Sequence, residues 1–297
     1  MLLGLAAPLL LYCQLLLYRP AQTNLERPLF QGIFYRREYR RSPRPIMLHI
    51  LRIHLQTPGI QPLVTPGNPT PDLRETHART TSEFLQEFQL QVAVNANFFY
   101  PFREDTPWDF YPHSGDRVNA VGLAISNHNT YSPTQANWVV LCFLPNQTAQ
   151  ILAQTTCPSG TTQAVAGSAL VVSAGRKVTV PSWLADADGI YSRTGVAIDA
   201  SGRTLWLIAV DDKQPLYSEG VSLEELADII LELGATAALN LDGGGSTTMV
   251  TATDHGPVLL NAPIHTKIPM RERPVANHLG FYANPLIPRS AFEQISR

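Results

Sequence analysis

The sequence predicts an α+β fold, in which a mixed, strand-rich sheet packs against a few helices. Two observations carry this prediction. Short apolar runs are separated by turn residues along most of the chain, and the 297 residues include 24 prolines and 19 glycines, a composition typical of short strands joined by turns. The clearest helical spacing is confined to residues 222–233. The chain therefore reads as strands with an occasional helix between them.

Residues 1–18 form a hydrophobic segment that is rich in leucine and carries no charged side chain. As a helix rising about 1.5 Å per residue, it reaches roughly 27 Å, just short of a bilayer core of about 30 Å. We expect a signal peptide or a membrane anchor, and hence an exported protein in the periplasm or outside the cell. Arg19 and Arg27 follow the segment, and the positive-inside rule opposes this orientation. Residues 19–28 are then a linker, and residues 29–297 form one catalytic-type domain.

Apolar runs predict the strands of this domain, and polar or turn residues end them. The expected strands are residues 33–41, 46–55, 90–94, 120–126, 138–144, 149–153, 196–198, 204–210 and 237–241. A short helix is expected to open at Thr80, and residues 104–116 are expected to form a loop. This loop contains Trp108 and is either a lid over a site or a plain surface excursion.

A helix, a strand and a glycine turn follow one another near the C-terminal end. Ser222 and Glu225 form a capping box that starts the helix, and Gly234 stands where a left-handed C-cap belongs. The next apolar run, residues 237–241, predicts a buried strand that ends at Asp242. Sites in mixed folds often lie at such strand ends.

The turn after this strand is the strongest functional candidate. It reads Asp242-Gly243-Gly244-Gly245-Ser246-Thr247. Glycine allows positive φ angles and lets another molecule approach the backbone, and successive free N–H groups form a concavity that suits an anion. A carboxylate beside such amides and hydroxyls can bind sugar hydroxyls, a phosphate or a metal ion. The alternative is a tight loop whose aspartate bonds its own backbone.

Other polar residues stand at strand ends. Asp211 follows the strand at 204–210, and we expect its strand to be a neighbour of the one that ends at Asp242, because the two flank the same helix. Asn95, with Asn97 beside it, ends the strand at 90–94. These amides either hold sugar hydroxyls or satisfy buried backbone groups.

Two arginines are candidate phosphate ligands. Arg193 and Thr194 precede the apolar run 196–198, and a guanidinium at a strand mouth can clamp a phosphate through two parallel hydrogen bonds. Arg273 is a second candidate. The alternatives are a salt bridge for Arg193 and plain surface charge for Arg273.

Composition and motifs exclude several classes of function. A net charge of −2 gives no reason to expect nucleic acid as a partner. The histidines show no His-Glu-x-x-His pattern, no Gly-x-Ser-x-Gly elbow occurs, and the glycine turn lacks the lysine of a P-loop. Three cysteines without metal-ligand spacing argue against structural zinc. Cys142 and Cys157 either pair or remain free; the sequence leaves this open.

Five ordered motifs resemble the phosphodiester glycosidase domain family, also called DUF2233 or the exopolysaccharide-biosynthesis domain, which includes the uncovering enzyme N-acetylglucosamine-1-phosphodiester α-N-acetylglucosaminidase. They span roughly residues 92–282. The motifs are Asn95-Ala96-Asn97-Phe98-Phe99, Arg193-Thr194-Gly195-Val196-Ala197, Asp211-Asp212-Lys213-Gln214, the Leu-Asp-Gly-Gly-Gly-Ser-Thr turn, and Arg273-Pro274-Val275-Ala276-Asn277. Asp212 replaces a usual glycine, Lys213 a usual arginine, and Asn97 a common glycine.

The resemblance implies an exported or membrane-anchored glycosidase that cleaves a sugar-1-phosphodiester in envelope or exopolysaccharide glycans. We expect Asp242, Asp211 and Arg193 to be catalytic. The expected substrate-binding residues are Asn95, Asn97, Thr194, Gly243, Gly244, Gly245, Ser246, Thr247 and Arg273. No cofactor is expected, although calcium or magnesium is possible. The expected partners are a glycan or sugar phosphate, no nucleic acid, and a membrane through residues 1–18.

Two alternatives stay open. One is a non-catalytic glycan-binding or anion-binding module of polysaccharide export. The other is a metal-dependent phosphodiesterase in which Asp211 and Asp242 are oxygen ligands.

Overall fold

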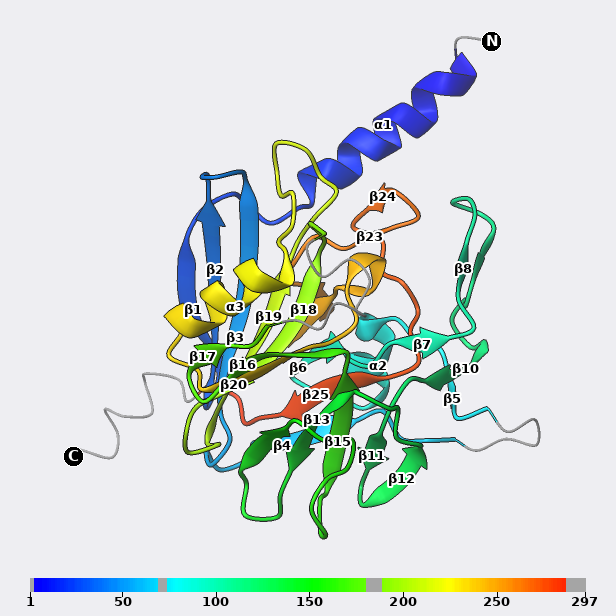
Figure 1. Ribbon diagram of the computed structural model, residues 1–297. Coiled ribbons are helices and arrows are strands. Elements are labelled where there is room, and N and C mark those ends of the chain that lie inside the picture. The colour runs from blue at the N-terminus through cyan, green and yellow to red at the C-terminus, as the bar shows by residue number, and fades with distance from the viewer. Residues whose placement is uncertain (1–2, 69–73, 180–188, 287–297) are drawn as a thin grey trace, which may run out of the picture.

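A computed structural model describes residues 3–68, 74–179 and 189–286 of the chain. Within these residues strands dominate, and the predicted α+β class is confirmed (Figure 1). The helices are α1 (Leu3–Leu17), α2 (Thr81–Glu87), α3 (Leu223–Glu232) and a 3₁₀ turn, η1 (Gly244–Ser246).

An antiparallel sheet of eight strands forms the largest layer. Its strands are, in spatial order, β1 (Leu25–Phe30), β2 (Ile33–Arg40), β3 (Ile46–His54), β19 (Thr204–Val210), β18 (Arg193–Ile198), β20 (Ala237–Asn240), β16 (Ala169–Ser173) and β17 (Arg176–Lys177). Residues 25–28, expected in the linker, belong to β1, which pairs with β2. The linker boundary expected at residue 28 is therefore wrong.

Two sheets of five strands lie against the large one. The first contains β12 (Asn129–Ser132), β11 (Ala124–Ser126), β15 (Gln163–Gly167), β13 (Val139–Phe143) and β14 (Ala149–Leu152). The second contains β22 (Gly256–Leu259), β21 (Met249–Thr253), β6 (Val92–Asn95), β25 (His278–Tyr282) and β4 (Gln61–Val64). The strand expected at 120–126 is interrupted at Gly122, whose φ of 81° marks a turn.

Three small sheets complete the fold. They pair β5 (Thr76–His77) and β7 (Phe99–Tyr100) with β10 (Arg117–Ala120), β23 (Ile264–His265) with β24 (Ile268–Pro269), and β8 (Arg103–Glu104) with β9 (Phe110–Tyr111). Hence the loop expected at 104–116 contains a short hairpin.

Strand β19 shows why central strands of the large sheet are apolar at nearly every position. Leu205, Leu207 and Ala209 face the core shared with the five-stranded sheets. The alternate residues, including Ile208, face the core beneath α3, and Figure 1 shows α3 lying across that side of the sheet. A strand buried on both faces needs apolar side chains at every position.

Helix α3 forms as the sequence predicts. The hydroxyl of Ser222 accepts a hydrogen bond from the backbone N–H of Glu225, whose carboxylate accepts one from the N–H of Ser222. Leu226 and Ile230 are buried on one face, and Gly234 has a φ of 82° after the last turn. The helix therefore returns the chain to the sheet, where β20 delivers the glycine turn.

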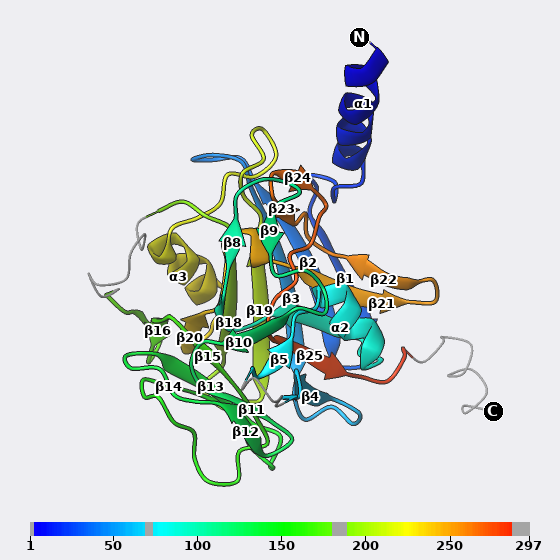
Figure 2. The ribbon, with the colours of Figure 1, turned by 90° about the vertical axis from the view of Figure 1, so that its right-hand side faces the viewer.

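The N-terminal helix α1 projects from the body of the molecule (Figures 1 and 2). Just after it, the guanidinium of Arg19 lies 4.4 Å from the centre of the Tyr217 ring. Among the described helices, α1 included, none is long and apolar enough to cross a membrane.

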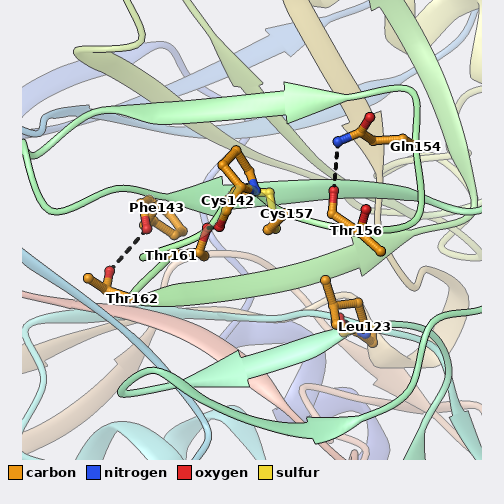
Figure 3. The surroundings of a disulfide bond; sticks show 10 residues. Leu123, Cys142, Phe143, Gln154, Thr156, Cys157, Thr161 and Thr162 are labelled. Carbon is orange, nitrogen blue, oxygen red and sulfur yellow. Dashed lines mark hydrogen bonds between the residues drawn. A yellow bond between two sulfur atoms is a disulfide. The ribbon is translucent and has the colours of Figure 1, made fainter.

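A disulfide bond joins Cys142 of β13 to Cys157, which follows β14 (Figure 3). The two Cα atoms are 5.8 Å apart and the bond closes a separation of 15 residues. The pairing that the sequence left open is thus formed in the structure.

Candidate functional site

Asp242 lies where β20 meets the glycine turn and is 8% exposed. Burial raises the pKa of its carboxyl from 3.8 to about 6. The Ser246 hydroxyl, the charge of Arg273 and the N–H of Gly243 each lower the pKa but only partly offset burial. A carboxyl with such a pKa changes its protonation state near neutral pH, which suits acid or base catalysis.

Close packing around the turn explains two of its three glycines. A Cβ on Gly243 would lie 2.5 Å from the carbonyl oxygen of Ser192, and one on Gly245 would lie 2.5 Å from Nη2 of Arg273. Gly244 has a φ of 59°, and its N–H donates to the carbonyl of Ser192 over 3.0 Å. The bare backbone therefore allows the guanidinium of Arg273 to lie directly on the turn.

Arg273 is the cation of this site. Its Nη1 donates to the hydroxyl of Ser246 over 3.2 Å, and its Nη2 pairs with the carboxylate of Glu104. The guanidinium also lies 4.4 Å from the centre of the Phe102 ring. A guanidinium held beside a carboxyl and a hydroxyl can bind a phosphate oxygen. Any phosphate that binds here competes with Glu104.

His265 lies behind Arg273 and is almost completely buried. Burial lowers the pKa of His265 to about 4, and the charge of Arg273 lowers it too. The ring is therefore neutral at pH 7, and its Nδ1 can accept the hydrogen bond from Nε of Arg273, 3.3 Å away.

Asn95 ties three segments together. Its Nδ2 donates to the carbonyl of Asp242 over 2.7 Å, and its Oδ1 accepts from the hydroxyl of Thr194 and from the N–H of Thr248. The N–H of Leu241 also donates to the carbonyl of Thr194 over 2.8 Å. The structure thus brings the asparagine strand, the start of β18 and the glycine turn together, as the sequence analysis expected.

Asn97 is fully buried and its amide is also engaged inside the protein. Its Nδ2 donates to the carbonyl of Val121 over 3.0 Å, and its Oδ1 accepts from the N–H of Ala166 and from Nδ2 of Asn277. Asn95 and Asn97 therefore position the strands around the turn. Their predicted contacts with substrate remain a prediction.

Arg193 is the first residue of β18 and directly follows Ser192, whose hydroxyl donates to the carbonyl of Gly244. Its Nε donates to the carbonyl of Val221 over 3.2 Å, its Nη2 donates to that of Gly189 over 2.8 Å, and its guanidinium lies 5.3 Å from the centre of the Tyr191 ring. The side chain is thus held in place by backbone acceptors beside the site.

Asp211 belongs to a buried network behind the turn. Its carboxylate accepts from Nδ2 of Asn261 and from the N–H of Ala262, and lies 3.1 Å from Nε2 of His49. The same Nδ2 of Asn261 donates to the carbonyl of Thr247 over 3.0 Å. The structure therefore shows Asp211 supporting the turn through Asn261.

The strands that end at Asp211 and Asp242 are not neighbours, because β18 lies between β19 and β20. This corrects the expectation that they pair. Among the described residues, no group of three or more His, Cys, Asp or Glu side chains is arranged to hold a metal ion.

Three residues of this region escaped the sequence analysis as site residues. Glu104 and His265 contact Arg273, and Asp212 is buried. Burial raises the pKa of Asp212, and Ser192, which also contacts Gly244, partly offsets this. Asp212 stood out in the sequence as a departure from a family motif, but no sequence pattern marked Glu104 or His265.

Comparisons with known proteins identify one matching family. A family model described as phosphodiester glycosidase matches residues 88–282. No curated protein matches the chain.

Three solved structures share the fold. The catalytic domain of zebrafish N-acetylglucosamine-1-phosphodiester α-N-acetylglucosaminidase, auto-inhibited by its pro-peptide, has a TM-score of 0.59 and 18% identity, with 92% of this chain and 93% of that chain covered. A hypothetical protein from Synechocystis has a TM-score of 0.62 and 17% identity; the match covers 89% of this chain and 64% of that one. A Burkholderia pseudomallei K96243 protein whose description names it as exported has a TM-score of 0.53 and 16% identity, with 80% and 74% covered.

Proposed function

The chain belongs to the phosphodiester glycosidase family, and on that premise we propose that it is a hydrolase that cleaves a sugar-1-phosphodiester. The bond that breaks joins the anomeric carbon to a phosphodiester oxygen. A water oxygen bonds to the anomeric carbon, and a phosphate monoester departs with the electron pair of the broken bond. This leaving group needs little protonation.

One observation carries the proposal: a carboxyl whose pKa is raised to about 6 stands beside a guanidinium that lies on the glycine turn. Asp242 in its ionised form accepts the proton of the attacking water or steadies the developing oxocarbenium ion, as carboxylates do in glycosidases. Arg273 stabilises the phosphate as its charge increases.

Other residues hold Asp242 and the glycine turn in position. Asn95, Thr194 and Asn261 hold the turn, and Asp211 anchors Asn261. We therefore assign Asp211 a positioning role. A phosphate contact by Arg193 stays a prediction, for which its place beside the turn is the support.

We further propose that the protein acts outside the cytoplasm on envelope or exopolysaccharide glycans. Disulfides such as Cys142–Cys157 persist in oxidising compartments. One protein of similar fold carries a description as exported. A role of residues 1–18 as signal peptide or anchor stays a prediction.

Substitution of Asp242 tests the proposed chemistry. With a synthetic methyl N-acetylglucosamine-1-phosphodiester as substrate, Asp242→Asn should lower kcat by about 10²- to 10⁴-fold, the contribution typical of a positioned acid or base. The matched control is Asp254→Asn, which changes an exposed aspartate on a turn. Circular dichroism checks that both variants are folded.

Three outcomes would contradict the proposal. A folded Asp242→Asn variant with wild-type turnover removes Asp242 from the chemistry. Binding of the diester without any turnover by the wild type favours a glycan-binding module. Loss of activity on chelation, together with turnover of diesters that contain no sugar, favours a metal-dependent phosphodiesterase.

A further inference from the structure

We propose that exposed aromatic side chains within residues 100–108 form a saccharide subsite beside the glycine turn. This subsite would bind further sugar units of a glycan whose phosphodiester lies at Arg273. The inference rests on the proposed function, which supplies the class of ligand. It adds that the preferred substrate is a chain of sugars rather than a single sugar-1-phosphodiester.

The aromatic rings are concentrated in one short stretch. Trp108 is 85% exposed, Tyr100 is 49% exposed and Phe102 is 47% exposed. Among the described residues after residue 18, these are all the Phe, Trp and Tyr side chains that are exposed. Large exposed apolar groups gathered in one place mark an interaction site more often than scattered ones do.

The stretch is fixed to the candidate site. Phe102 lies under the guanidinium of Arg273, with 4.4 Å from its ring centre to the carbon of the guanidinium, and Glu104 pairs with the same group. At the tip of the hairpin, Nη1 of Arg271 donates to the carbonyl of Pro107 over 2.8 Å. Figure 2 shows β8 and β9 on the same side of the molecule as β23 and β24. A ligand that leaves Arg273 along the hairpin therefore passes Phe102 and then Trp108, which follows Pro107 at the tip; Tyr100 lies in β7, two residues before Phe102.

The polar groups between the rings favour a saccharide over a lipid or an apolar protein surface. Arg103 pairs with Asp105 and Asp109 over 2.6 Å each, and all three side chains are at least half exposed. Residues 100–111 contain no aliphatic Leu, Ile or Val. A pyranose ring has an apolar C–H face bordered by hydroxyls, so it matches flat rings interspersed with charged hydrogen-bonding groups.

The test separates binding from turnover. In an Asp242→Asn background, calorimetry measures the affinity for an oligomer of N-acetylglucosamine 1-phosphate and for the methyl N-acetylglucosamine-1-phosphodiester. The double change Tyr100→Ala/Trp108→Ala should weaken oligomer binding about tenfold, as expected for two lost aromatic contacts, and leave binding of the small diester within about twofold. Val258→Ala, which changes a 46% exposed apolar residue of β22, is the matched control and should change neither.

Several results would overturn the subsite. One is that the Asp242→Asn protein with its aromatic residues intact binds the oligomer and the small diester with equal affinity, or binds neither. Another is that the double change leaves the affinity for the oligomer unchanged. Loss of vesicle binding or of self-association in the double variant, with glycan affinity unchanged, would assign the rings to a membrane or to a second copy. Turnover of the small diester by the wild type reports separately on the proposed function, so the two hypotheses can fail independently.

Discussion

At the scale of single residues, Asp242 and Asp211 have similar positions but different surroundings. Each follows the end of an apolar strand, β20 for Asp242 and β19 for Asp211. They differ in their partners: Asp211 is bonded by groups from Asn261 and Ala262 and lies beside His49, 162 residues away. Asp242 has fewer donors, and burial raises its pKa. Long-range contacts of this kind leave no trace in local sequence.

The raised pKa of Asp242 has a consequence for stability. The folded protein holds this proton up to about pH 6, whereas the unfolded chain releases it near 3.8. Between these values the folded state binds more protons, so the contribution of Asp242 to stability falls as pH rises and is fully lost above pH 6. Ionised Asp242 therefore destabilises the fold at pH 7.

We predict that Asp242→Asn raises the free energy of unfolding at pH 7, by up to about 3 kcal/mol for a pKa difference of about two units. The gain should disappear near pH 3, below both pKa values, where the wild-type carboxyl is mostly protonated in both states. Thermal unfolding of wild type, Asp242→Asn and Asp254→Asn at the two pH values measures it. The same pH dependence in all three proteins would contradict a raised pKa.

At the scale of elements, the glycine turn was the part of the site most visible in the sequence. Its capped helix, buried strand and terminal aspartate all appear where expected. The spatial order of the strands was not predicted correctly. β18 lies between β19 and β20, and the order of strands along the chain does not indicate this. The hairpin β8–β9 escaped for a similar reason: each strand has only two residues, too few for an alternating pattern.

The three glycines should respond differently to alanine. Gly243→Ala should destabilise the fold by about 1 to 3 kcal/mol, because its Cβ meets a backbone oxygen that cannot move away cheaply. Gly244→Ala has no neighbour within 4 Å and should cost only about 1 to 2 kcal/mol for its positive φ. Gly245→Ala should instead raise KM, because its Cβ displaces the guanidinium of Arg273 from the turn.

Thermal unfolding and KM for the methyl diester distinguish the three variants. An unchanged KM in Gly245→Ala, with Gly243→Ala as stable as the wild type, would show that the turn is not packed as the structure describes.

At the scale of the whole molecule, the sequence predicted the α+β class and most strands, because hydrophobic periodicity is a local property. The disulfide was not decided by sequence, since spacing along the chain does not give the distance between two Cα atoms. The predicted boundary between the linker and the domain lay too far along the chain. β1 has polar residues near its start, and its pairing with β2 is what identifies it as a strand.

Removal of the disulfide should weaken the fold and spare the site. The double change Cys142→Ala/Cys157→Ala should lower the free energy of unfolding by about 3 kcal/mol, the value typical of a loop of about 15 residues. KM should stay the same, because the bond belongs to the β13 sheet and not to the strands that carry the turn. Cys13→Ala, which removes the exposed free cysteine, is the control. An unchanged Tm in the double variant would contradict a formed bond.

The central claim is that the site breaks the carbon–oxygen bond of a glycosyl phosphodiester. Hydrolysis of the methyl N-acetylglucosamine-1-phosphodiester in ¹⁸O-labelled water, followed by mass spectrometry of both products, tests this claim most directly. The account predicts that the label enters the sugar at its anomeric carbon and that the phosphate monoester stays unlabelled. Label in the phosphate would contradict it, because attack at phosphorus is phosphodiesterase chemistry.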